Sequence, residues 1–297
     1  MSRGNRREIN VRGILLVAGS EFVRWLVNPK MFVFAIIFLP LRDLIVLPMM
    51  QASEKMGSPL GILESSIATM NSLLGVILLT LTYLLLISSF PTVDGNVLFY
   101  IARMGRRNWI LGEMLFHVIS AVAYSLLITV VSAAQIAAQS FWANGWSLVV
   151  TDYDRMFGQE GGGETMRGLI PPNLYFQMAP VKAYLLSFGL LTLFFILLGL
   201  IFLAGVLCGK RVLCFLLQVV HLIPGCGMIM LNSSGMWGFP LAHAMLLFHF
   251  QEYMREYECS PWLSIVLFSS VLAVVGFGLY RTVKGVSLDL IGEGVAS

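Results

Sequence analysis

The residues of this sequence that could do chemistry are a few ionisable side chains inside apolar segments. Arg42 and Asp43 are neighbours within the apolar segment Met31–Met50, and His117 and His221 stand in two later apolar segments. At 1.5 Å per helical residue, all four lie roughly 13–18 Å from the start of their segments. A charge in hydrocarbon costs several kcal/mol unless it is paired or hydrated, so it normally faces the protein interior. We therefore predict that the four side chains form one polar layer at a similar depth.

Two interpretations of this polar layer stay open. The layer lines a translocation path, or an Arg42–Asp43 pair locks helices together. Glu113 is a separate case, because it lies only about two helical turns into its apolar segment. Its side chain is expected to extend towards water at the nearer membrane surface.

A second group of candidate residues lies in the segment Phe90–Asn108. The apolar middle of this segment, Val97–Ala102, follows Asp94. Three arginines come after it: Arg103, Arg106 and Arg107. An acid before a helix and bases after it suit the helix dipole, so we predict a short helix here. Such a helix in a basic loop is a docking element for a partner, unless the arginines serve only to fix the topology of the chain.

Motifs for catalysis or nucleotide binding are not found in the sequence. The text from Gly205 to Arg211 is the nearest to a phosphate-binding loop, and its spacing is wrong. No metalloprotease, esterase or paired-carboxylate motif occurs. The four cysteines show neither a CxxC pair nor a Cys/His metal spacing, and unpaired thiols are expected: Cys208, Cys214, Cys226 and Cys259. We therefore expect no catalytic residue, no metal site and no cofactor, so that the chain is not an enzyme by itself.

The composition indicates lipid as the main solvent. Hydrophobic residues make up 58% of the 297 residues and charged residues 12%, and the mean hydropathy is +0.83. Soluble domains carry about 25% charged residues. The net charge of +3 is too small to indicate nucleic-acid binding.

Six apolar segments are long enough to cross about 30 Å of hydrocarbon as helices. They are Met31–Met50, Met70–Ser89, Asn108–Ala134, Val181–Leu207, Val212–Leu231 and Trp262–Tyr280. The predicted fold class is an all-α polytopic membrane protein with six transmembrane helices.

Basic residues predict the orientation of these six helices. One set of helix ends carries most of them: Arg3, Arg6, Arg7, Arg12, Arg24, Lys30, Arg103, Arg106, Arg107, Lys210, Arg211, Arg281 and Lys284. The other set carries Lys55, Arg155, Arg167, Lys182 and Arg255. The positive-inside rule places the first set, with both termini, in the cytoplasm of a multi-pass cell-membrane protein.

The segments outside the spans complete the predicted organisation. Residues 1–30 are a cytoplasmic tail and an amphipathic elbow helix, Val11–Val27, which lies in the membrane interface. Residues 31–280 are the six-helix domain, and 281–297 are a second cytoplasmic tail. The ten-residue apolar run in Gly235–Pro261 is too short to span, so a re-entrant segment is predicted between the fifth and sixth helices. Loop 135–180 on the outer side is either a small cap or an ordered loop.

This combination resembles the permease subunits of type-2 ABC exporters. In that family an elbow helix precedes six spans, a coupling helix joins the second and third, and a re-entrant element lies between the fifth and sixth. The places of those elements are taken here by Val11–Val27, Phe90–Asn108 and Gly235–Pro261. The local text Asp94-Gly95, Leu98 and Arg106–Gly112 is similar to the family's loop entering the third span. Glu113 stands where the family often has lysine, and loop 135–180 is longer than in compact members.

The resemblance implies a transport function. Two permeases, identical or related, would dock on two ABC ATPase subunits and export an amphipathic or hydrophobic substrate through the lipid membrane. Coupling to the ATPase would fall to Asp94, Arg103, Arg106 and Arg107. An ion-coupled secondary transporter or channel, in which Arg42, Asp43, His117 and His221 form the ion path, is the main alternative. A non-transporting membrane assembly subunit is another, and a membrane-embedded enzyme is the least favoured.

Overall fold

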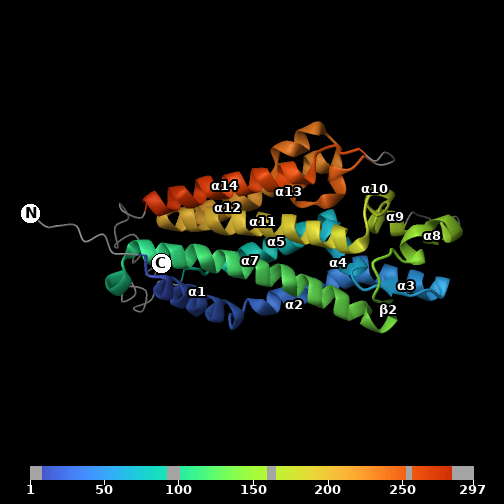
Figure 1. Ribbon diagram of the computed structural model, residues 1–297, viewed down its shortest axis with the longest axis horizontal. Coiled ribbons are helices and arrows are strands. Elements are labelled where there is room, and N and C mark those ends of the chain that lie inside the picture. Colours follow the sequence, from blue (N-terminus) through green and yellow to red (C-terminus); the bar gives the residue numbers. More distant parts are fainter. Residues whose placement is uncertain (1–8, 92–100, 159–164, 252–255, 283–297) are drawn as a thin grey trace, which may run out of the picture.

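The computed structural model describes residues 9–91, 101–158, 165–251 and 256–282. Within these ranges, five helices are long and apolar enough to cross a membrane, and a bent helix pair makes a sixth crossing if it is counted as one span. The long helices run side by side along the long axis of the molecule (Figure 1). The predicted class, an all-α polytopic membrane protein, is confirmed.

The crossings lie close to the predicted apolar segments. The five continuous ones are α2–η1–α3 (Met31–Met56), α7 with η2 (Arg106–Gln139), α11 (Pro180–Leu207), α12 (Arg211–Met230) and α14 (Pro261–Thr282). The first is made of α2 (Met31–Leu41), the π-helical turn η1 (Arg42–Val46) and α3 (Leu47–Met56). In the α7 crossing, α7 itself ends at Ile136 and η2 spans Ala137–Gln139.

The candidate sixth crossing is a pair of helices that meet at an angle of 79°, α4 (Glu64–Asn71) and α5 (Leu73–Ile87). Ser72 adopts an extended conformation between them, and its Oγ accepts a hydrogen bond from the Gly75 amide at 3.3 Å. A Cβ atom on Gly75 would lie 2.9 Å from the Thr69 carbonyl oxygen. Glycine at this position therefore permits the sharp bend.

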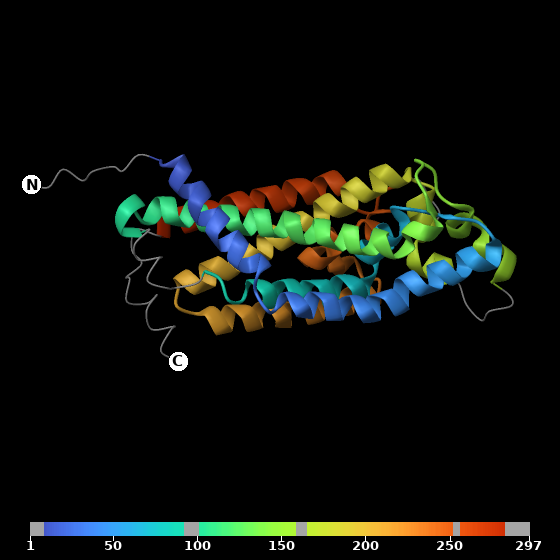
Figure 2. The same ribbon diagram turned by 90° about the horizontal axis from the view of Figure 1, so that it is seen from below.

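The first helix, α1 (Val11–Leu26), crosses α7 obliquely at one end of the bundle (Figure 2). The two backbones approach closely at Gly112, where a Cβ atom would lie 2.7 Å from Val17. A helix is thus present where an elbow was predicted. Glu21 of this helix, although it is charged, is buried against the bundle.

We call the end of the bundle near α1 the basic end. It carries Lys30, Arg103, Arg106, Arg107, Lys210, Arg211 and Arg281. The opposite end carries α3 and α8 (Figure 1). The names identify the two ends without placing either in a cellular compartment.

The segment between α12 and α14 folds back onto the bundle instead of crossing it. It contains η3 (Ser234–Gly238), α13 (Pro240–Ala244) and η4 (Leu246–His249), which contact α11 and α12. Asn71, at the bend between α4 and α5, accepts a hydrogen bond from the Leu247 amide at 3.0 Å and donates to Ser187 Oγ of α11 at 2.9 Å. Asn71, at the bend between α4 and α5, therefore holds the folded-back segment against the bundle.

Loop 135–180 forms a small cap at the opposite end of the bundle. It contains β2 (Ser140–Phe141), which pairs in parallel with β1 (Leu60–Gly61), and three short helices: α8 (Leu148–Phe157), α9 (Thr165–Leu169) and α10 (Pro172–Tyr175). The buried carboxylate of Glu64 accepts hydrogen bonds from the Gly61 amide, the Ser147 amide and Ser147 Oγ at 2.7–2.8 Å. This carboxylate ties the cap to α4.

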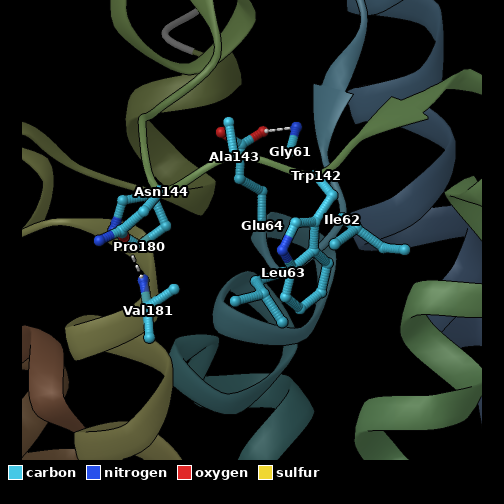
Figure 3. A pocket seen from close by; sticks show the side chains of 9 residues that line it. All are labelled: Gly61, Ile62, Leu63, Glu64, Trp142, Ala143, Asn144, Pro180 and Val181. Carbon is cyan, nitrogen blue, oxygen red and sulfur yellow. Dashed lines mark hydrogen bonds between the residues drawn. The ribbon is translucent and has the colours of Figure 1, made fainter.

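A pocket of about 40 Å³ lies beside Glu64, between the cap and the start of α11 (Figure 3). Trp142, Asn144 and Pro180 are among the residues that line it. A single water needs about 10–15 Å³ by the same measure. The pocket therefore has room for a few waters and none for an amphipathic substrate.

Candidate functional site at the basic end

The centre of the candidate site is the segment of residues 88–108, which joins α5 to α7 and includes the first three residues of α7; we call it the connector. Its described part comprises residues 88–91 and 101–108, and residues 101–104 are helical. Asp94, predicted to couple to an ATPase, lies outside the described residues. Both described ends of the connector are attached to the bundle.

The first end of the connector is held by two cations from different helices. Lys30, at the corner between α1 and α2, donates from Nζ to Ser88 Oγ and to Ser89 Oγ at 2.7 Å each. Arg211, at the start of α12, donates to the Phe90 carbonyl oxygen at 3.4 Å. Burial, followed by repulsion from Arg211, lowers the pKa of Lys30. The start of the connector is thereby linked to α1, α2 and α12.

The second end of the connector is held through Asn108. Its Oδ1 accepts from the Asn10 amide at 3.2 Å, and its Nδ2 donates to the Met104 carbonyl oxygen at 2.8 Å. Asn10 also caps α1, because its side chain accepts from the Gly13 amide at 3.0 Å. One buried amide therefore joins the helical turn of the connector, the start of α7 and the cap of α1.

A separate apolar cluster lies beneath the same turn. Its buried members come from α1, the connector, α7, α11 and α14: Val17, Ile101, Met104, Trp109, Ile110, Leu200, Leu203, Leu207 and Leu279. The two connector residues, Ile101 and Met104, are each 7% exposed. The connector therefore packs against four helices, α1, α7, α11 and α14.

The three predicted coupling arginines differ in their surroundings. Arg103 is exposed, while Arg106 and Arg107 are half-buried. The Arg107 guanidinium lies 5.5 Å from the centre of the Tyr280 ring in α14. Arg107 thus adds a further link from the connector to α14, and Arg103 presents the most accessible charge of the three.

Charged groups also lie in the seam between α1 and α7. Arg24 Nη1 is 3.2 Å from Glu21 Oε1, and the Glu21 side chain is almost fully buried. Glu113 of α7 is 0% exposed, and neither of its carboxylate oxygens has a hydrogen-bond partner in the described part of the chain. The expectation that Glu113 extends to water is wrong, because α1 lies over this part of α7 and covers it.

The predicted polar layer is not formed. Phe34 of α2 contacts Tyr124 of α7, with 5.3 Å between ring centres. Arg42 lies about 12 Å beyond this contact along its helix, and His117 lies about 10 Å before it. The two are therefore separated by roughly 22 Å along the bundle. The offset arises because α1 occupies the seam beside the start of α7, so that α2 begins deeper in the bundle.

Arg42 and Asp43 are exposed on the surface of the chain, against the expectation that they face its interior. They begin the π-helical turn η1, in which the Leu47 amide donates to the Arg42 carbonyl oxygen five residues earlier. Pro48 follows and has no amide hydrogen with which to continue the regular ladder. In the described residues they form no salt bridge with each other.

The two histidines of the predicted layer occupy different settings. His117 is fully buried against α11, where a Cβ atom on Gly199 would lie 2.8 Å from His117 Nδ1. This close fit favours a packing role. His221 is half-buried, and its ring lies 6.0 Å from that of Phe239 in the folded-back segment.

The sequence did not predict the contacts of several residues that the fold brings together. Lys30 and Arg211 were used only to orient the helices and Asn108 was assigned no role, and only their position at helix ends could have suggested that they hold the connector. His243, His249 and Cys259 were expected to form no metal site, yet their ligand atoms all lie within 4.8 Å of one another. Their spacing along the chain matches no common metal-binding pattern.

Comparisons with protein-family models, with curated proteins and with solved structures find no match to this chain. The candidate site is therefore interpreted from its own geometry.

Proposed function

We propose that the chain is the membrane-spanning permease subunit of an exporter driven by a separate ATPase subunit. The observation that carries the proposal is the attachment of one connector to helices on every side of the basic end. Hydrogen bonds link the connector to the α1–α2 corner, α12 and the cap of α1. Its apolar residues pack with α1, α7, α11 and α14.

Such a connector suits the transfer of force from a partner. A push on it is shared among the ends of several helices at once, because well-packed groups transmit strain. The exposed Arg103 and the half-buried Arg106 offer positive charge to an acidic or polar groove on the ATPase. In this proposal the basic end faces the cytoplasm of the cell membrane, and both termini lie there.

A second permease copy, or a related permease, completes the proposed transporter. Arg42 and Asp43 are exposed within an apolar span, where contact with lipid would be costly. A partner helix or a water-filled path between two permeases would cover or hydrate them. The amphipathic or hydrophobic substrate would then cross between the two copies.

The decisive experiment reverses the charge of the connector. The chain is purified from native membranes with any bound ATPase, and Arg103, Arg106 and Arg107 are changed together to Glu. Loss of at least tenfold in ATPase binding and in stimulated hydrolysis is expected. The matched control changes Arg155 and Lys182 to Glu, since both are exposed basic residues of the opposite end. This control should leave ATPase binding unchanged.

Two outcomes contradict the proposal. Unchanged ATPase binding by the triple variant, with the elution profile and melting temperature of the parent, would refute the docking role. Substrate flux driven by an ion gradient in vesicles that hold only this chain would instead establish the secondary transporter.

A further inference from the structure

A group of polar side chains lies between the folded-back segment and α14, far from the connector. His243 lies in α13, His249 is the last residue of η4, and Ser264 lies in the first turn of α14. The histidines are 4% and 0% exposed, and Ser264 is 0% exposed. Cys259, just before α14, is partly buried beside them. Buried polar groups need partners, so the hydrogen bonds of this group can be traced one by one.

The outer nitrogen of each imidazole contacts a backbone carbonyl. His243 Nε2 lies 2.9 Å from the Trp237 carbonyl oxygen, and His249 Nδ1 lies 3.0 Å from that of Met245. A carbonyl oxygen only accepts, so both of these nitrogens carry a hydrogen. Burial disfavours the charged imidazolium form. The inner nitrogens, His243 Nδ1 and His249 Nε2, are therefore left as lone-pair donors.

Both inner nitrogens point at the same hydroxyl group. Ser264 Oγ lies 2.7 Å from His243 Nδ1 and 2.8 Å from His249 Nε2. A serine has a single hydroxyl hydrogen, and it can satisfy only one of the two lone pairs. The other lone pair is left without a hydrogen from Ser264. A purely structural network would not be expected to aim two bases at one proton.

Cys259 places a sulfur atom at the same point. The sulfur and one ring nitrogen of each histidine all lie within 4.8 Å of one another. The hydrogen bond from Cys259 Sγ to the Ser260 carbonyl oxygen is long, at 4.0 Å, and the thiol also interacts with the Ser264 side chain that both histidines contact. Two imidazole nitrogens and one thiolate are three of the four ligands of a common tetrahedral zinc site.

We propose that His243 Nδ1, His249 Nε2 and Cys259 Sγ bind a zinc ion, with Ser264 Oγ or a water as the fourth ligand. The carbonyl partners of the outer nitrogens are the second-shell contacts that fix the tautomer of zinc-binding histidines. On binding, the Cys259 thiol releases its proton to solvent and ligates as thiolate. The ion would fasten α13 and η4 to the start of α14. This proposal does not depend on the transport function.

The chain offers a clean test because it has only four histidines and four cysteines. The full-length protein is purified in detergent with an affinity tag that contains no histidine. Cys208, Cys214 and Cys226 are changed to Ser, which leaves Cys259 as the sole thiol. The metal-free protein is then treated with a maleimide in the presence of buffered free Zn²⁺, and with Mg²⁺ for comparison.

Zinc should slow the alkylation of Cys259 at least tenfold, and magnesium should have no effect. His249→Gln should abolish this protection, whereas His221→Gln, which alters a histidine outside the cluster, should keep it. Alkylation at the same rate with and without zinc would overturn the proposal. So would full protection by zinc in the His249→Gln variant.

A second measurement covers the case in which His249→Gln fails to fold. Cys259→Ser keeps every histidine hydrogen bond, so it should retain the fold. Zinc titration should then show one bound ion per chain for the parent and at least a tenfold weaker affinity for Cys259→Ser. Equal affinity in the two proteins would refute the assignment of Cys259 as a ligand. Loss of the characteristic thiolate-to-metal absorption with Co²⁺ in Cys259→Ser would support it.

Discussion

Two buried glutamates, one near each end of the bundle, have opposite surroundings. Glu64 and Glu113 are both 0% exposed. The carboxylate of Glu64 accepts three hydrogen bonds, two of them from backbone amides. The carboxylate of Glu113 has no hydrogen-bond partner among the described residues and lies under α1. The same residue type therefore stabilises the cap and carries a burial cost in the α1–α7 seam.

This difference separates a rigid end from an adjustable one. At the opposite end, buried hydrogen bonds that Glu64 and Asn71 accept hold the cap and the folded-back segment in one arrangement. At the basic end, the first end of the connector is held by a partly exposed lysine, Lys30, and the second end by the buried Asn108 and a small apolar cluster. The partly exposed lysine is easier to displace than a buried network. The basic end is thus the place where a partner's force would produce movement.

The largest expected effect comes from breaking the rigid end. Glu64→Ala removes all three hydrogen bonds and leaves the Ser147 and Gly61 amides buried without partners, so it should destabilise the protein by about 3–5 kcal/mol. The measurement is thermal or denaturant unfolding in detergent. Glu54→Gln is the matched control, because Glu54 is exposed. A loss below about 1 kcal/mol would mean that the cap does not depend on this carboxylate.

The seam should respond in the opposite direction. Glu113→Met replaces an unpartnered buried carboxyl group by an apolar side chain of similar length, and a gain in stability of about 1–3 kcal/mol is expected. The melting temperature of the detergent-purified protein provides the measurement. Destabilisation by this change would show that the carboxyl group has a partner in the membrane, such as a water or a second chain.

The smallest effect on stability is expected at the connector. Lys30→Met removes the two hydrogen bonds to Ser88 and Ser89, at a cost of about 1 kcal/mol, because the lysine is partly exposed. If force passes through the connector, the same change should reduce ATPase-stimulated transport much more than it reduces stability. Lys182→Met, at the opposite end, is the control. If Lys30→Met and Lys182→Met reduced transport by the same small amount, the two ends of the bundle would not differ in function.

The parts of this fold that could be predicted from sequence are those set by local composition. The long apolar segments, and the apolar run after α12 that is too short to span, are set by neighbouring residues. Hydropathy and length are therefore enough to identify them. Residue chemistry also pointed to the basic segment between the second and third spans. What the segment touches could not be predicted, because Lys30 and Arg211 come from distant parts of the chain.

The errors arose where relative placement decides the outcome. A depth counted from the start of each helix is misleading, because α2 begins deeper in the bundle than α7. Arg42 is exposed and begins an irregular turn before Pro48, which composition does not reveal. The contact between Glu64 and Ser147 joins residues 83 positions apart. His249 and Cys259 meet only because the chain folds back, which no spacing rule anticipates.

The bend between α4 and α5 has a consequence for the surrounding bilayer. All eight residues of α4 are buried, so lipid beside the second crossing meets only α5, through side chains such as Leu74 and Leu81. The 15 residues of α5 extend about 22 Å, well short of the roughly 30 Å of a typical hydrocarbon layer. Where a single chain meets lipid at α5, hydrophobic mismatch would thin the membrane locally. The side of the protein formed by α5 should therefore respond to the thickness of the surrounding bilayer.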